Sequence, residues 1–89
     1  MTVRKRVRAH GRVQGVFFRD SLRRAADRAG VAGWAVNRPD GTVEAVLEGP
    51  ADAVERLVEL CRHGPGHADV ERLDVDVEEP QGLRGFDVG

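Results

Sequence analysis

The sequence predicts an α+β protein in which two helices cover one face of an antiparallel sheet. Three observations support this class. Two stretches carry apolar residues at helical spacing, and several others alternate apolar and polar residues as half-buried strands do. Their order places one helix between the first two strands and the other before the fourth. With 89 residues, the chain is expected to form one domain, residues 1–89, with a modest core.

The N-terminal third is predicted to contain a strand, a loop and a helix. The strand is indicated by the alternating apolar residues Val3, Val7 and Ala9, although Lys5 interrupts this row. Residues 11–18 form a glycine-bearing loop. Either Asp20 or Ser21 is expected to cap the helix, and Gly30 to end it. The inward face of this helix consists of Leu22, Ala25, Ala26 and Ala29.

The rest of the chain supplies a hairpin, a helix and two more strands. Residues 32–48 are predicted to form the hairpin, because the turn sequence Pro39-Asp40-Gly41 divides two alternating runs. The second helix runs from near Pro50 to about Arg62, with an apolar face of Val54, Leu57, Val58 and Cys61. Residues 63–68 are irregular, and strands follow at Leu73, Val75 and Val77 and at Phe86 and Val88. This βαββαβ order with a short C-terminal strand is the split βαβ, or ferredoxin-like, arrangement.

Charge is unevenly distributed along the chain. The formal net charge is −1, yet the first 28 residues are strongly basic and the segment from Asp69 to Glu79 is strongly acidic. Such polarity suits an anionic ligand bound near the N-terminal half. Solvated faces of opposite sign explain the same distribution, so charge alone leaves both interpretations open.

Cysteine and histidine usage indicates a reducing compartment and no metal. The single Cys61 cannot form an internal disulfide, and its place on the apolar helix face predicts a small buried side chain. His63 and His67 have a spacing of four but flank an irregular Gly-Pro-Gly segment, so no metal site is predicted there. Residues 1–13 lack the apolar run of a signal peptide, and no stretch approaches a membrane span. We therefore expect a cytoplasmic protein that does not bind membranes.

The loop between the first strand and the first helix has the features of an anion site. Gly11 and Gly15 permit positive φ angles, so consecutive N–H groups can point into one concavity. A helix N-terminus follows directly, and it favours an anion. Arg19 adds a planar guanidinium that can contact two phosphate oxygens. Taken alone, these residues also fit a plain turn with core phenylalanines and a surface arginine.

Two longer motifs resemble those of the acylphosphatase family. The first spans residues 11–19, GRVQGVFFR, directly after the predicted strand. The second spans residues 33–44, GWAVNRPDGTVE, and is followed by Glu48-Gly49-Pro50. The resemblance covers residues 3 to about 63 well and is looser afterwards, ending in Phe86-Asp87-Val88.

This resemblance implies hydrolysis of acyl phosphates to a carboxylate and inorganic phosphate, without a metal or other cofactor. Phosphate would be bound by Arg19 and by the loop Val13, Gln14, Gly15, Val16, Phe17 and Phe18. Asn37 would position the attacking water. Inorganic phosphate would then be both product and competitive inhibitor. Physical chemistry agrees, because phosphoryl transfer from a good leaving group needs positioning and charge stabilisation more than a strong base.

A nucleic-acid-binding module is one competing interpretation, because RNA-recognition domains share this arrangement. A small-molecule regulatory domain of the same fold is another, but it would normally accompany a catalytic domain that 89 residues cannot contain. RNA-recognition domains stack bases on exposed aromatics of the central strands, whereas this chain has three Phe, one Trp and no Tyr. Phe17 and Phe18 lie in the loop, and Trp34 is expected to anchor the core of the hairpin. His10 precedes the loop and is close enough in sequence to touch substrate, but it is interpreted as a strand-end residue, packed or exposed. We therefore expect a monomeric enzyme that binds no nucleic acid.

Overall fold

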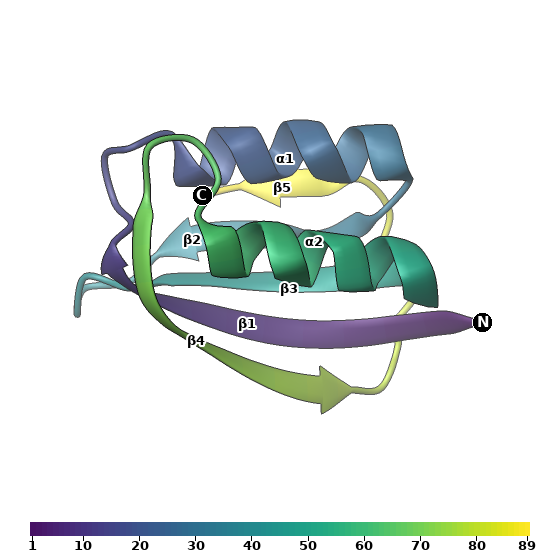
Figure 1. The fold of residues 1–89 in the computed structure, drawn as a ribbon. Helices are drawn as coiled ribbons and strands as arrows, with labels where there is room; N and C mark the ends of the chain where they lie inside the picture. The colour runs from purple at the N-terminus through teal and green to yellow at the C-terminus, as the bar shows by residue number, and fades with distance from the viewer.

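The computed structural model describes residues 1–89, which form five strands and two helices. In chain order these are β1 (Thr2–Arg12), α1 (Phe18–Ala29), β2 (Ala32–Asn37), β3 (Val43–Pro50), α2 (Ala51–His63), β4 (Asp69–Glu78) and β5 (Phe86–Val88). Both helices cover the same face of one sheet (Figure 1). This confirms the predicted ferredoxin-like α+β fold. Neither helix has the length and apolar character needed to cross a membrane.

The strands follow one another in the order β4-β1-β3-β2-β5. The first four pair antiparallel, as predicted. The C-terminal strand instead pairs parallel with β2, so the sheet is mixed and the antiparallel expectation holds for β1 to β4 only. The reason is the connection after β4, which crosses to the opposite edge of the sheet (Figure 1). After this crossing, β5 runs antiparallel to β4 and therefore parallel to β2.

The core lies between the sheet and the helices. Among its 19 buried residues are Val7, Ala9, Leu22, Ala26, Val43, Ala45, Leu47, Val54, Leu57, Val58 and Cys61. Ala25 and Ala29 are partly buried and pack against this core, so both predicted helix faces are confirmed. Lys5, which interrupts the apolar row of β1, pairs with Glu55 of α2 at the margin of this core.

The helix-free face of the sheet carries ion pairs. Arg4 donates hydrogen bonds to Glu48 at 3.3 Å and to Glu78 at 2.9 Å. Arg6 donates to Glu78 at 2.6 Å and to Glu44 at 2.8 Å. We call Arg4, Arg6, Glu44, Glu48 and Glu78 the ion-pair network. It arises because alternate residues of β1 and β3 point away from the helices.

Trp34 also lies on this face, so its expected role as a core anchor is wrong. It is partly buried, with the Arg6 guanidinium 5.3 Å from its ring centroid. Trp34 lies opposite Val46 of β3, on the helix-free face. Its neighbour Ala35 belongs to the core. The period of two along a strand therefore directs Trp34 away from the helices.

Glu48 holds the long connection between β4 and β5. Its carboxylate is 4% exposed and accepts hydrogen bonds from the backbone N–H groups of Gln81, Gly82 and Leu83 at 2.7–2.9 Å. Burial raises the pKa of this carboxyl, but these N–H groups and Arg4 outweigh it, so the pKa lies below its ordinary value. The crossing segment is thus fixed to the sheet by one buried anion.

Candidate active site

The loop between β1 and α1 leads into a helix without a side-chain cap. The helix begins at Phe18, and the preceding residue, Phe17, adopts a left-handed conformation with φ 64°. The expected capping role of Asp20 or Ser21 is therefore wrong, because both residues already lie inside the first turn. Asp20 instead accepts a hydrogen bond from Arg23 at 2.9 Å and pairs with Arg24 at 3.1 Å.

This start leaves a row of backbone amides without an acceptor in the protein. The first hydrogen bond of the helix is donated by the Ser21 N–H to the Phe17 carbonyl oxygen, at 3.0 Å. None of the amides of residues 13–20 donates a hydrogen bond to another protein group. Gly15, with φ 70°, and Phe17 turn the chain so that the loop is concave. Free amides at the positive end of a helix dipole favour an anion.

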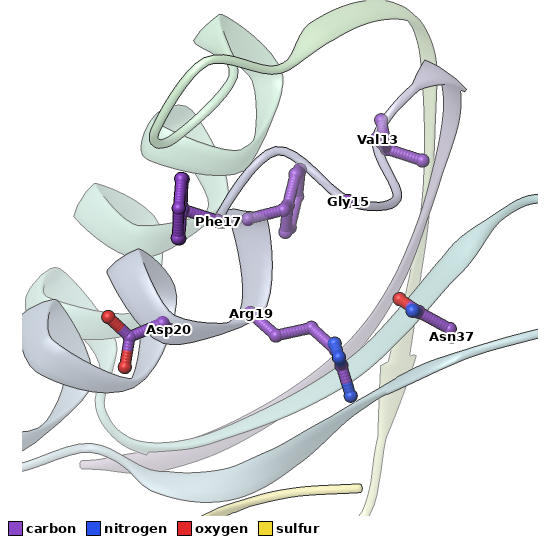
Figure 2. A pocket seen from close by; sticks show the side chains of 7 residues that line it. Val13, Gly15, Phe17, Arg19, Asp20 and Asn37 are labelled. Carbon is purple, nitrogen blue, oxygen red and sulfur yellow. The ribbon is translucent and has the colours of Figure 1, made fainter.

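A cavity of about 240 Å³ opens beside these amides (Figure 2). Its lining residues are Val13, Gly15, Phe17, Phe18, Arg19, Asp20 and Asn37. Six of the eight residues predicted for the site therefore surround one pocket. Gln14 and Val16 do not line it. Asp20 was not predicted to belong to the site, and the signal that could have revealed it is its place beside Arg19 in the first helical turn.

Arg19 is the pocket's unpaired cation. Its side chain extends from the first turn of α1 toward Asn37 (Figure 2). Arg23 and Arg24 on the same helix both pair with Asp20, whereas Arg19 has no carboxylate partner. The hydrogen bond from Arg23 lowers the pKa of Asp20, which stays ionised, and Figure 2 shows its carboxylate turned away from Arg19. Arg19 is thus free to bind an anion.

Asn37 reaches the pocket from the other side. As the last residue of β2, it has the same parity as Ala35 and points to the side of the sheet that carries the helices. The next residue, Arg38, points to the opposite side and pairs with Glu44. The exposed side chain of Asn37 makes no hydrogen bond within the protein, so both its donor and its acceptor can serve a ligand.

The two predicted loop residues outside the pocket connect the loop to its surroundings. The Gln14 side-chain amide donates hydrogen bonds to the carbonyl oxygens of Arg38, at 2.8 Å, and Thr42, at 2.9 Å. Val16 packs its side chain into the core, and its carbonyl oxygen accepts from the His67 N–H at 3.0 Å. Gln14 therefore ties the loop to the β2–β3 turn, and Val16 ties it to the segment before β4.

Other reactive side chains lie outside the pocket. Cys61 is fully buried, and burial raises the pKa of its thiol to about 12, as suits the predicted core role. His10 lies 2.8 Å from an oxygen of Asp74, next to the helix-free face. His63 ends α2, while the ring of His67 lies edge-on to Phe17, with 6.2 Å between centroids. No three His, Cys, Asp or Glu side chains converge as metal ligands would.

A ferredoxin-like fold with unbonded amides and one unpaired arginine around a single pocket defines a small α+β protein equipped to bind an anion. The family model described as Acylphosphatase matches residues 5–88. The chain is 60% identical to the acylphosphatase of Rubrobacter xylanophilus, over 98% of this chain and 80% of that protein. It is 58% identical to the acylphosphatase of Gloeobacter violaceus, over 92% of each. The chain belongs to the acylphosphatase family and is a hydrolase.

The solved structures agree with this assignment. The crystal structure of acylphosphatase from Bacillus subtilis superimposes with a TM-score of 0.92 at 36% identity, covering 100% of this chain and 99% of that one. The family and the fold are therefore established together, over nearly the whole length of the chain.

Proposed function

We propose that this protein hydrolyses acyl phosphates to a carboxylate and inorganic phosphate. The phosphate is bound by the backbone amides of the loop that ends at Phe18 and by Arg19, and the attacking water is positioned by Asn37. One observation carries the proposal: residues 13–20 have backbone amides without an acceptor in the protein, and most of these residues line a pocket together with the side chain of Arg19, which has no carboxylate partner. The names of the relatives, all acylphosphatases, support the same reaction.

The phosphate contacts divide between backbone and side chain. Amides at a helix N-terminus give several directed N–H donors to the phosphoryl oxygens. The guanidinium of Arg19 adds two parallel donors and a full positive charge. These groups are fixed before the substrate arrives, so they stabilise the charge that develops on the phosphoryl oxygens at no reorganisation cost.

Asn37 acts on the water. Its amide can donate to and accept from water and substrate at the same time, which holds the water in line with the leaving group. The water oxygen forms the new bond to phosphorus, and the bond to the acyl oxygen breaks with its electron pair leaving on the carboxylate. The water proton passes to a phosphate oxygen. No protein base is needed, because a carboxylate is a good leaving group.

The proposed mechanism also supports inhibition by phosphate and independence from metals. Inorganic phosphate, as product, occupies the amide and Arg19 site and competes with substrate. Because backbone and guanidinium supply all the positive charge, we propose that the reaction is independent of metals. We further propose a monomeric enzyme of the cytoplasm that binds no nucleic acid.

The test is phosphate release from benzoyl phosphate and acetyl phosphate beside a phosphate monoester, with two variants. Arg19→Ala should weaken phosphate binding, measured by calorimetry, and lower kcat by roughly 10²–10³. Asn37→Ala should bind phosphate normally but lose most of kcat. Arg28→Ala is the matched control, because Arg28 also lacks a carboxylate partner but lies in the last turn of α1. A folded Asn37→Ala protein with near-native turnover contradicts the water-positioning role.

A further inference from the structure

We propose that the segment between α2 and β4, residues 64–68, is a positioning element of the active site. In this inference, which rests on the proposed function, Gly66 and His67 hold the peptide group between Val16 and Phe17. They thereby direct the Phe17 N–H at the phosphate. The motifs of the sequence give this segment no role, since it lies beyond the residues that carry them.

Backbone atoms of the two segments are in direct contact. The His67 N–H donates a hydrogen bond to the Val16 carbonyl oxygen at 3.0 Å. Gly66, with φ 68°, lies so close that a Cβ atom there would be 2.6 Å from the Val16 oxygen and 3.1 Å from the Phe17 oxygen. Figure 1 shows both segments at the same end of the molecule, beside the start of α1. Only glycine allows this approach.

The hydrogen bond to Val16 determines where the next amide points. A trans peptide group is planar, and its C=O and N–H point in opposite directions. Because the Val16 carbonyl points at His67, the Phe17 N–H is directed away from residues 64–68. Phe17 lines the pocket, and its N–H has no acceptor in the protein. This amide is therefore available to an anion in the pocket.

Phe17 needs such external support. Its φ of 64° is unfavourable for a side chain with a Cβ atom, so the loop would relax if nothing held it. Two hydrogen bonds hold it: His67 fixes the carbonyl before the Phe17 amide, and Ser21 fixes the carbonyl after it, at 3.0 Å. Preorganised donors of this kind are the ones that stabilise charge in a transition state.

The positioning segment is itself attached to the body of the protein. Arg12 donates to the His67 carbonyl oxygen at 3.0 Å and to Asp69 at 3.2 Å. Ala68 is buried, and its N–H donates to the Pro65 carbonyl oxygen at 3.3 Å. None of these contacts involves the pocket. Residues 64–68 can therefore act as a fixed support against which the binding loop rests.

The test compares two glycine-to-alanine variants. Gly66→Ala places a methyl group against the Val16 and Phe17 carbonyls. Gly82→Ala has a similar φ of 75° but no atom within 4 Å of the added carbon, so it shares the conformational penalty without the displacement. We expect Gly66→Ala to weaken phosphate binding and to lower kcat/KM by roughly tenfold to a hundredfold, and Gly82→Ala to do neither. Equal phosphate dissociation constants in the two variants overturn the proposal.

His67→Ala separates backbone from side chain. It keeps the N–H and removes the ring, so phosphate affinity should stay within about twofold of the parent protein. A loss as large as that of Gly66→Ala would assign the effect to the imidazole and overturn the backbone role. Arg19→Ala, measured alongside, distinguishes the two failures. If Arg19→Ala leaves phosphate binding intact, the proposed phosphate site is wrong. If Arg19→Ala weakens phosphate binding but Gly66→Ala does not, only the positioning role of residues 64–68 is wrong.

Amide hydrogen exchange on the parent protein provides a test that no folding defect can disturb. The His67 N–H should be protected in the free protein, because the Val16 carbonyl accepts it. The Phe17 N–H should exchange freely and become protected when inorganic phosphate is added. Rapid exchange at His67 in both states, or unchanged exchange at Phe17, would overturn the proposal.

Discussion

The side-chain amide of Gln14 donates a hydrogen bond to the carbonyl oxygen of Thr42 at 2.9 Å. A second bond goes to the carbonyl oxygen of Arg38, the residue after Asn37, at 2.8 Å. Thr42 in turn accepts from the Arg38 N–H, which closes the β2–β3 turn. Gln14 therefore couples the proposed phosphate loop to the strand end that carries Asn37.

Replacing Gln14 should separate these two halves of the site. We expect Gln14→Ala to lower the free energy of unfolding by about 1–2 kcal/mol, because the two hydrogen bonds from the Gln14 side chain to the carbonyl oxygens of Arg38 and Thr42 are lost. It should lower kcat more than phosphate affinity, because Asn37 moves relative to bound phosphate. Urea unfolding and steady-state kinetics test this, with Gln81→Ala, whose exposed side chain makes no hydrogen bond, as the control. Native kcat in a folded Gln14→Ala protein would contradict the coupling.

The ion-pair network should make stability depend on acid pH. Hydrogen bonds from Arg6 and then Arg4 lower the pKa of Glu78 from 4.5 to about 2. Because the folded state binds this proton more weakly than the unfolded state, the contribution is complete above pH 4.5 and is lost as the pH falls toward 2. Glu78→Gln should therefore flatten the fall in unfolding free energy across this window. Glu79→Gln removes no ion pair and should leave this fall unchanged. If the unfolding free energies of the two variants depend on pH in the same way, the proposed contribution of Glu78 is ruled out.

Cys61 should be unreactive in the native protein. Its thiol is buried and its pKa is raised to about 12, so a thiol reagent at pH 8 should label it only in denaturant. Cys61→Ala should keep its kcat and lose about 1 kcal/mol of stability, because it leaves a small cavity among Leu57 and Val58. Labelling kinetics with and without urea test the first point. Loss of activity in a folded Cys61→Ala protein would assign the thiol a role that its position does not provide.

Exhaustive chelation should leave the hydrolytic activity unchanged. The proposed site draws its positive charge from backbone amides and Arg19, neither of which a chelator removes. The measurement is phosphate release after dialysis against EDTA, with and without added magnesium. A loss of activity that magnesium restores would show that a cation supplements the amide site.

Most of the fold could be predicted because the hydrophobic periods are clear. The alternation around Val75 and the stripe of Val54, Leu57 and Val58 each fit one element type. The facing of Trp34 could not be predicted, since alternation separates two faces without saying which one the helices will cover. The start of α1 is not predictable in this way either, because Asp20 and Ser21 are good capping residues, whereas the helix follows a left-handed Phe17.

The candidate site also has features that the sequence predicts and features that it does not. Arg19 and Asn37 were predicted together through the two motifs, and they do meet at one pocket. The links that hold the loop were not predictable, because Gln14 contacts carbonyls 24 and 28 residues away and Val16 contacts His67. Every residue has a backbone carbonyl, so the residue type does not indicate which carbonyl accepts a hydrogen bond from a distant part of the chain.

Successive side chains of β1 point to opposite faces of the sheet, and this separates two sets of residues that can be substituted during evolution. Arg6 and Glu78 bind each other on one side of the sheet, while Arg19 belongs to the pocket at the end of the helix-covered side. Substitutions of Arg4 or Glu78, which pair within the network and not with a pocket residue, need not move the second side, since sites without shared partners act nearly independently. Ion-pair networks gain value as temperature rises. Adaptation to heat and adaptation of turnover can therefore proceed through separate sets of residues in a chain of only 89.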